Sequence, residues 1–310
     1  MKTAWLFPGQ GTQTVGMGKA LFAASAAARE VFDRADRALG WSLSKLCFEG
    51  PEEELTLTAN TQPAIVTVSI ATLAAIREAR PDLPPPAFAA GHSLGEYSAL
   101  VAARALGLED AVRLVHSRGK AMQEAVPDGE GAMAALMGAE AEGAARLCEE
   151  AAEGGVVEPA NFNAPGQIVI AGQRAAVERA MKLAESRKMK AILLKVSAPF
   201  HCSLMAGAAA HMKRELESIV FSPLAFPVIS NVEATPNQDP GRVAELLVRQ
   251  IDGAVRWQQS IAAMAEAGVT EALEIGPGKV LAGLAKRIDK RIRVQSVADP
   301  ESLAALGPSA

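Results

Sequence analysis

A glycine-flanked serine is the feature of this sequence that most constrains the fold. The apolar run Ala87-Phe88-Ala89-Ala90 leads into Gly91-His92-Ser93-Leu94-Gly95, and a helix-compatible stretch covers residues 96–105. This strand–turn–helix order is typical of a nucleophile elbow, in which the turn is so tight that the neighbours of the serine must be nearly free of side chains. The turn raises the hydroxyl of Ser93 out of the sheet and leaves the amide of Leu94 free to bind an oxyanion. We therefore expect Ser93 to be a nucleophile rather than part of an ordinary glycine turn.

Size and composition limit the class of protein. The 310 residues are enough for one large domain with an insertion or for two modest domains. Hydrophobic residues make up 49% and charged residues 21%, which is typical of a soluble globular protein, and the net charge of -4 argues against general nucleic-acid binding. Three widely spaced cysteines without a C-x-x-C pair indicate a reducing compartment. The first apolar segment, which ends at Pro8, is too short for a signal peptide or a membrane span, so we expect a cytoplasmic protein without a membrane partner.

Alternating strand and helix patterns predict an α/β fold with an inserted unit. Short apolar runs at residues 4–7, 87–90, 227–231 and 271–275 are typical of buried strands, and helical patterns separate them. From residue 129 the pattern changes to strand, helix, strand, strand, helix, strand, which is the order of a ferredoxin-like unit. Its strands are expected at 132–137, 156–161, 167–172 and 191–196, and its helices at 139–152 and 174–188. The sequence thus predicts a large catalytic domain of residues 1–128 and 197–310 and a small domain of residues 129–196.

The serine needs a base within hydrogen-bond reach, and the chain has four histidines. His92 is adjacent to Ser93 and points elsewhere, His116 lies on the predicted solvated face of a helix, and His211 lies within another helix. Only His201 follows directly after a strand, where the active-site residues of α/β folds gather. We therefore expect His201 to be the base.

No carboxylate between Ser93 and His201 combines a strand end with a loop context, so a backbone carbonyl is expected to orient the histidine, giving a dyad. Cys202 is expected to be a packed thiol, because its side chain cannot converge on that of the adjacent His201. No set of histidines, cysteines and carboxylates has the spacing of metal ligands.

One arginine lies on the apolar side of a predicted helix over residues 108–123. Arg118 follows Val115 by three positions and precedes Met122 by four, so it shares their face. A guanidinium on a buried face needs an anion or several carbonyl partners to offset its lost hydration. Spacing alone leaves two interpretations open: a structural arginine, either ion-paired or reaching out to solvent, and a site for a substrate anion.

Beyond the elbow, five further motifs are distributed along nearly the whole chain. They are Phe7-Pro8-Gly9-Gln10-Gly11, Thr61-Gln62-Pro63-Ala64, Asn163-Ala164-Pro165-Gly166-Gln167, Phe200-His201 and Glu274-Ile275-Gly276-Pro277-Gly278. Together with Gly91-His92-Ser93-Leu94-Gly95-Glu96, this ordered set closely resembles the malonyl-CoA:acyl-carrier-protein transacylases of bacterial type II fatty-acid synthesis. Esterases would share the elbow alone, but not the ordered set.

The resemblance implies roles at the reacting centre. Ser93 would accept the acyl group, and His201 would be its base. The main-chain amides of Gln10 and Leu94 would form the oxyanion hole. The main-chain carbonyl of Gln250 would orient His201, so that the side chain of Gln250 would not be its critical part.

Two further residues are implied to act on the substrate. Arg118 would hold the free carboxylate of the malonyl group, which favours the second interpretation given above. Phe200, directly before the histidine, resembles the malonyl-selective form of related acyltransferase domains, whereas the methylmalonyl-selective form usually has serine there.

The resemblance also implies a fold and a reaction. The fold would be an α/β-hydrolase-like large domain with a ferredoxin-like (βαββαβ) small domain. The reaction would be a ping-pong transfer from malonyl-CoA, through a malonyl-serine, to the phosphopantetheine thiol of holo acyl carrier protein, and it would need no metal, nucleotide or redox cofactor. Three alternatives remain: a hydrolase on the same elbow, a non-catalytic subunit that docks carrier proteins, and the same chemistry in a polyketide or polyunsaturated-lipid pathway.

Two basic clusters are candidate docking surfaces for an acidic carrier protein. The first consists of Arg187, Lys188 and Lys190, and the second of Lys286, Arg287, Lys290, Arg291 and Arg293. Taken alone, each cluster is more typical of a solvated face.

Overall fold

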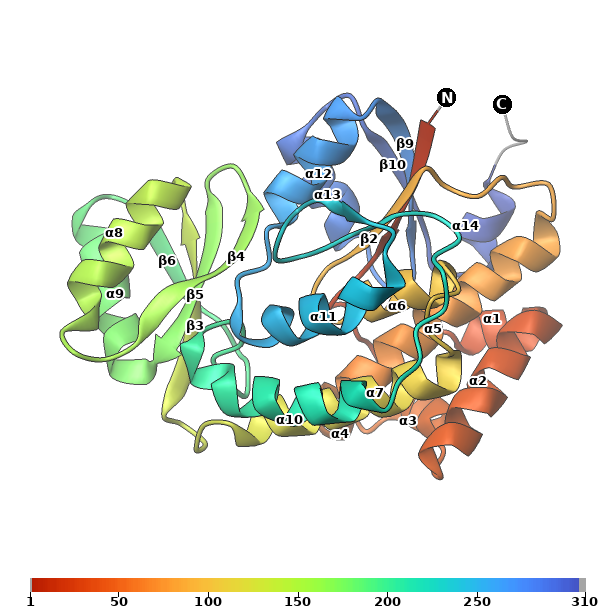
Figure 1. Ribbon diagram of the computed structural model, residues 1–310, viewed down its shortest axis with the longest axis horizontal. Helices are drawn as coiled ribbons and strands as arrows, with labels where there is room; N and C mark the ends of the chain where they lie inside the picture. The colour runs from red at the N-terminus through yellow and green to blue at the C-terminus, as the bar shows by residue number, and fades with distance from the viewer. Residues whose placement is uncertain (1, 307–310) are drawn as a thin grey trace.

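The computed structural model describes residues 2–306, which form two β-sheets and the helices that cover them (Figure 1). The larger sheet has the strand order β10-β9-β1-β2-β7-β8. Its strands are β1 (Lys2–Phe7), β2 (Phe88–Gly91), β7 (Val228–Ile229), β8 (Pro236–Asn237), β9 (Val269–Ile275) and β10 (Arg293–Val297). All neighbours in this sheet are parallel except β7 and β8. The mixed α/β architecture expected from the sequence is therefore confirmed.

Both faces of the larger sheet are buried, as a parallel sheet requires. Along β1, Trp5 and Phe7 belong to one hydrophobic cluster, and Ala4 and Leu6 belong to another on the opposite face. The first cluster packs against α2 (Ala26–Leu39), α5 (Thr58–Ala79), α6 (Gly95–Ala102) and α7 (Leu108–Glu124). The second packs against α12 (Trp257–Glu266) and α13 (Val280–Ile288). The alternation of side chains along a strand accounts for both layers.

The remaining elements of this part of the chain complete the helical layers. They are α1 (Lys19–Ala24), α3 (Leu43–Glu49), α4 (Glu52–Thr56), α10 (Ala206–Glu217), α11 (Val243–Asp252), α14 (Pro300–Ala304) and the 3₁₀ turns Ser203–Met205 and Pro240–Arg242. Helix α11 carries Gln250.

The long helix α5 lies in the core and contains a proline in its second turn. Its length and composition alone would let it cross a membrane, but 83% of its apolar window is buried inside the protein. Pro63 has no amide to donate, so the carbonyl of Ala59 one turn earlier lacks its helical partner. His116 Nδ1 occupies that carbonyl at 2.8 Å. The expectation of a solvated His116 is therefore wrong, because the proline leaves an acceptor that draws the ring inward.

The second sheet has the order β4-β5-β3-β6, and every neighbouring pair is antiparallel. It consists of β3 (Gly131–Met137), β4 (Val157–Ala164), β5 (Gln167–Gln173) and β6 (Lys190–Leu193), with α8 (Ala141–Ala152) and α9 (Arg174–Ser186) between them in the chain. Figure 1 shows both helices on the outer side of this sheet, away from the larger one. The predicted order of strand, helix, strand, strand, helix, strand is confirmed.

Several strand boundaries differ from the prediction. β6 ends at Leu193 and not at residue 196, so residues 194–200 separate this strand from His201. β4 continues to Ala164, so the turn to β5 contains only Pro165 and Gly166, with Gly166 at φ 70°. In the larger sheet, β7 stops at Ile229, two residues earlier than expected. Asn231 leaves the strand ladder there because its side chain binds the elbow: its Oδ1 accepts a hydrogen bond from the amide of Ser93.

The glycines of the elbow are required by close backbone contacts. A Cβ atom at Gly91 would lie 1.9 Å from the carbonyl carbon and oxygen of Gly95. A Cβ atom at Gly95 would lie 2.3 Å from the carbonyl oxygen of Phe7. Real Cβ contacts are never this short, so the turn between β2 and α6 packs onto the end of β1 only with glycine at both positions.

We expect Gly95→Ala to distort the elbow, since the new methyl group meets the backbone of β1 and not a movable side chain. Overpacking of this kind should lower the free energy of unfolding by about 1–3 kcal/mol, measured by urea denaturation. Gly283→Ala is the matched control, because a Cβ there meets nothing within 4 Å. At this exposed position of α13 the change should stabilise the protein by about 0.4–1 kcal/mol. Equal stability of Gly95→Ala and the wild type would contradict the steric argument.

Candidate active site

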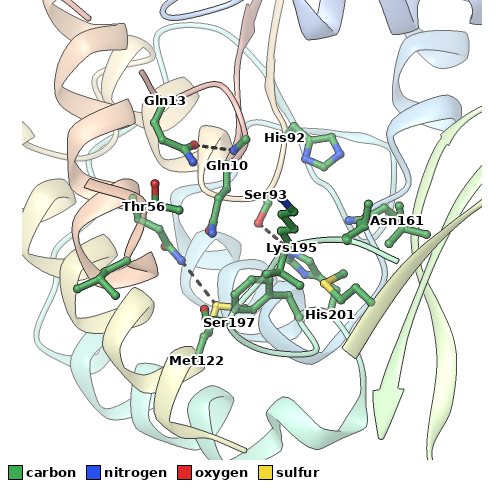
Figure 2. Close-up of a pocket in the computed structure, with 18 of the residues that line it drawn as sticks. Gln10, Gln13, Thr56, His92, Ser93, Met122, Asn161, Lys195, Ser197 and His201 are labelled. Carbon is green, nitrogen blue, oxygen red and sulfur yellow. Dashed lines mark hydrogen bonds between the residues drawn. The ribbon is translucent and has the colours of Figure 1, made fainter. Parts of the chain in front are cut away.

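Five of the site residues predicted from the sequence line one cavity of about 690 Å³ between the two sheets: Gln10, Ser93, Arg118, Phe200 and His201. Leu94 and Gln250 lie directly behind it, next to Ser93 in the chain and in hydrogen-bond contact with His201, respectively. Ser93 follows β2, His201 follows β6, and Gln10 follows β1. Arg118 reaches the cavity from α7. Figure 2 shows the hydroxyl of Ser93 directed towards His201, with Gln10 on the opposite side of the serine. The loops of Ser93 and Gln10 follow the carboxyl ends of the parallel strands β1 and β2, where ligands bind in open α/β sheets, whereas His201 comes from the segment that follows β6 of the antiparallel sheet.

Ser93 and His201 form a direct hydrogen bond. Their Oγ and Nε2 atoms are 2.8 Å apart, and His201 Nδ1 lies 2.8 Å from the main-chain oxygen of Gln250. A carbonyl oxygen can only accept, so Nδ1 carries the proton and Nε2 is free to take the proton of the serine. The backbone carbonyl expected from the sequence is thus the partner of the histidine.

Both residues are held in an unusual backbone conformation. Ser93 has φ 52° and His201 has φ 61°, in the left-handed region that non-glycine residues seldom adopt. Asn231 secures the serine, since it accepts from the amide of Ser93 and donates from Nδ2 to the carbonyl of Gly91, both at 2.7 Å. The sequence analysis missed Asn231, although its place at the end of a predicted strand was a usable signal.

The amides of Gln10 and Leu94 have no acceptor among residues 2–306. Leu94 precedes the first turn of α6, where amides have no intrahelical partner. The loop of Gln10 is fixed at two points: Thr12 donates to the carbonyl of Gly9 at 2.9 Å, and Gln10 Nε2 donates to Thr58 Oγ1 at 3.2 Å. Both amides are therefore available to a ligand.

Arg118 is buried, with 1% of its surface exposed, its hydrogen bonds all go to neutral oxygens, and its guanidinium lies over the ring of Tyr97, 5.9 Å from the centroid. Nη1 donates to Gln62 Oε1 at 2.7 Å, and Nη2 donates to Gln250 Oε1 at 2.8 Å and to Ser93 Oγ at 3.0 Å. Nε has no partner in the described part of the chain. Within residues 2–306 no carboxylate forms a salt bridge with this guanidinium. The interpretations as an ion-paired or solvent-reaching arginine are therefore wrong.

The side chain of Gln250 is more involved than the resemblance implied. Besides its contact with Arg118, its Nε2 donates to the main-chain oxygen of Ser93 at 2.9 Å and to Glu96 Oε2 at 2.7 Å. Glu96 is 3% exposed, and burial raises its pKa to about 7. Sequence reasoning missed Gln62 and Glu96, although both belong to motifs that were recognised.

The other candidates are placed as follows. Phe200 is buried and lines the cavity. The buried thiol of Cys202 donates to the carbonyl of Pro199 at 3.1 Å, as expected of a packed cysteine. His92 Nε2 is 2.8 Å from Asn163 Oδ1, and His211 contacts Ser117, so neither histidine reaches the serine. Residues 2–306 contain no group of three or more His, Cys, Asp or Glu that could hold a metal ion.

Comparison with known proteins identifies the family. A family model described as the acyl transferase domain matches residues 4–307. The chain therefore belongs to the acyl transferase family. It is 49% identical to the malonyl CoA-acyl carrier protein transacylase of Bacillus subtilis, over 97% of this chain and 95% of that protein. It is 47% identical to the enzyme of the same name from Escherichia coli, over 97% of each chain.

Solved structures agree with this family assignment. The acyl-carrier-protein S-malonyltransferase of Bartonella henselae superposes with a TM-score of 0.95 at 47% identity, over 98% of both chains. A malonyl-transacylase in complex with a type II PKS acyl carrier protein also gives a TM-score of 0.95, at 44% identity over 98% of both chains. The resemblance inferred from the motifs is confirmed.

The surroundings of His201 keep its imidazole neutral. Burial, followed by the positive charge of Arg118, lowers the pKa of His201 to about 3. The unfolded chain takes up this proton near pH 6.5, whereas the folded protein does so only near pH 3. The part of the free energy of unfolding that depends on a neutral His201 is therefore fully present above about pH 6.5. It is lost as the pH falls from about 6.5 towards 3.

We expect the imidazole of His201 to remain neutral from about pH 8 to about pH 5, a range in which an unperturbed histidine becomes protonated. The measurement is an NMR titration of labelled histidines, with the His201 signal assigned by its absence from His201→Ala. In Arg118→Ala the pKa of His201 should rise, because a neighbouring positive charge has been removed. A midpoint above pH 5 in the wild type would contradict the prediction.

Proposed function

We propose that this protein transfers the malonyl group of malonyl-CoA to the phosphopantetheine thiol of an acyl carrier protein through a malonyl-serine intermediate, and so supplies chain elongation in fatty-acid synthesis. The observation that carries the proposal is the position of a buried, uncompensated guanidinium beside the hydroxyl of a serine–histidine pair. The histidine activates the serine as a nucleophile for acyl transfer, and the guanidinium can bind the free carboxylate of the acyl group. The names of the relatives agree with this substrate and acceptor.

In the first half-reaction, His201 Nε2 takes the proton of Ser93 as Oγ attacks the thioester carbonyl. The oxyanion accepts hydrogen bonds from the amides of Gln10 and Leu94. When the tetrahedral intermediate collapses, the carbon–sulfur bond breaks and the proton passes from His201 to the sulfur of departing CoA. Arg118 holds the malonyl carboxylate throughout, and Phe200 closes the acyl side of the cavity.

The second half-reaction reverses the roles. The phosphopantetheine thiol gives its proton to His201 and attacks the ester carbonyl, the carbon–oxygen bond to Ser93 breaks, and the proton returns to Oγ. The carbonyl of Gln250 keeps the imidazole in the required tautomer in both directions. The thioester of malonyl-CoA, the thiol of the carrier protein and the serine–histidine dyad supply every proton and electron pair, so no metal or redox cofactor enters the scheme.

The same proposal includes the organisation of the chain. Residues 1–128 and 197–310 would form an α/β-hydrolase-like catalytic domain, and residues 129–196 a ferredoxin-like small domain. The parallel order of the larger sheet and the antiparallel order β4-β5-β3-β6 support this division.

A cytoplasmic location agrees with three cysteines that are all free and buried.

Ser93→Ala should abolish the malonyl adduct that intact-mass measurement detects after mixing with malonyl-CoA, because no other hydroxyl bonds to His201 Nε2 in the described chain. His201→Ala should slow adduct formation by about 10²–10⁴-fold, the usual contribution of a general base. Ser186→Ala, at an exposed serine, is the control and should form the adduct normally. A stable adduct in Ser93→Ala would end this proposal, and free malonate as the main product would favour a hydrolase.

Arg118→Ala should lose malonyl transfer and gain relative activity with acetyl-CoA, since the pocket no longer holds an unpaired charge. A two-point contact between arginine and carboxylate is worth about 1.5–3 kcal/mol, which corresponds to about 10–150-fold in the ratio of malonyl to acetyl acylation rates. Arg118→Lys should restore only part of the ratio, because an ammonium cannot make both contacts. An equal fall of both rates in Arg118→Ala would mean that the arginine is structural.

The two basic clusters differ in how many of their charges are already paired. In the second cluster, Arg291 pairs with Asp289 and Glu266, and Arg293 pairs with Glu271. In the first, Arg187 pairs with Glu150. The exposed lysines of the two clusters form no salt bridge within residues 2–306; they are Lys188, Lys190, Lys286 and Lys290. These lysines are the charges we propose for contact with the acidic carrier protein.

Reversing the lysines of the docking cluster (Lys188→Glu with Lys190→Glu, or Lys286→Glu with Lys290→Glu) should slow transfer to the carrier protein in a salt-dependent way and leave acylation by malonyl-CoA unchanged. The control is Lys19→Glu with Lys45→Glu, which makes the same change of charge at exposed positions outside both clusters. Stopped-flow or quenched measurement of each half-reaction separates the two steps. Equal losses in both half-reactions would argue against docking at that cluster.

A further inference from the structure

Glu96 is a buried carboxylate to which the reaction scheme gives no role. It lies in the first turn of α6, three residues after Ser93, and is 3% exposed. Its Oε2 accepts two hydrogen bonds, from Gln250 Nε2 at 2.7 Å and from the amide of Asn231 at 3.1 Å. It has no hydrogen bond to His201 and no salt bridge to Arg118 within residues 2–306. Its hydrogen bonds therefore reach the site only through the residues that it holds, and its charge acts on Arg118 only through space.

The contacts of Gln250 determine which way its amide faces. Its NH₂ group donates to Glu96 Oε2 and to the main-chain oxygen of Ser93, and neither of these atoms can donate to it. The amide oxygen must then face Arg118, whose Nη2 lies 2.8 Å away. The reverse orientation would set oxygen against two acceptors and NH₂ against a cationic donor. With the acceptor of Glu96 present, only one orientation of the Gln250 amide satisfies all three of its hydrogen-bond neighbours.

This arrangement fixes the guanidinium without neutralising it. A carboxylate in direct contact with Arg118 would form a buried ion pair and compete with an anionic acyl group. The amide of Gln250 stands between Glu96 and Arg118, so the arginine receives a neutral oxygen and keeps its charge. Gln62 supplies a second neutral oxygen on the other side. The charge of Arg118 therefore remains available at the hydroxyl of Ser93.

We propose that Glu96 is a positioning residue that, by accepting from the amide of Gln250, holds the oxygen of that amide on Arg118 and so sets the preference for an acyl group with a free carboxylate. The inference rests on the proposed function, because it takes the acyl carboxylate as the anion that Arg118 binds. The role requires an acceptor and not a charge. Both donors reach the same oxygen, which can accept whether the other oxygen is protonated or not.

The test compares Glu96→Met, which removes the acceptor at similar size, with Glu96→Gln, which keeps one. The readout is the ratio of acyl-enzyme formation rates with malonyl-CoA and acetyl-CoA. Glu96→Met should lower the ratio about tenfold or more, as expected when a charge-assisted contact is misplaced. Glu96→Gln should keep the ratio within about threefold of the wild type, since its amide oxygen can take the same two donors. In the Arg118→Ala background, Glu96→Met should not change the ratio further.

Different outcomes separate this inference from the proposed function. A wild-type protein that forms no malonyl adduct would end both. If the wild type forms the adduct normally but Glu96→Met leaves the ratio of malonyl to acetyl rates unchanged, only the role of Glu96 is overturned. The same conclusion follows if Glu96→Met lowers the malonyl and acetyl rates equally. If Glu96→Gln lowers the malonyl-to-acetyl ratio as much as Glu96→Met does, the charge of Glu96 is required. That result also overturns the proposed role of Glu96 as an acceptor. If Glu96→Met does not fold, Gln250→Met carries the same prediction, because it removes the amide and leaves the main-chain carbonyl for His201.

Discussion

The close approach of two backbone segments, the elbow and the end of β1, is the constraint on which the site depends. Gly95 packs against the carbonyl of Phe7, and the amide of His92 donates to that same carbonyl at 3.0 Å. This contact places the serine loop beside the loop of Gln10, and Ser93 and Gln10 line the same cavity. A larger residue at either elbow glycine would separate the segments, and the strained φ of Ser93 would lose its support.

Around this contact, the guanidinium of Arg118 is hydrogen-bonded to neutral side chains, and its Nε has no partner in the described chain. Arg118, Gln250 and Gln62 share their hydrogen bonds within a cavity lined on the other side by Met133 and Val169 of the small sheet. In a buried, largely apolar environment an unpaired charge is costly, and each hydrogen-bond donor fixes the orientation of the acceptor next to it. The consequence is a site whose electrostatics are set before a substrate arrives: the imidazole is neutral and the guanidinium is uncompensated.

Several features of the fold could be predicted because they depend on local pattern. The order of strands and helices followed from hydrophobic runs, and the elbow followed from two glycines around a serine. The exceptions had a common cause, which is contact with residues distant in the chain. β7 is short because Asn231 turns towards the elbow, and His116 turns inward because Pro63 leaves the carbonyl of Ala59 unpaired.

The sequence by itself determined the α/β pattern, the nucleophile and its histidine, and, through the ordered motifs, the family. It left the state of Arg118 open, since spacing places a residue on a face but does not give its partners. Only the tertiary structure decided that this guanidinium meets no carboxylate in the described chain and that the side chain of Gln250 joins it to Glu96. The physical reason is that hydrogen-bond partners of buried groups come from elements 25 to 157 residues apart, and their identity is fixed only when those elements pack.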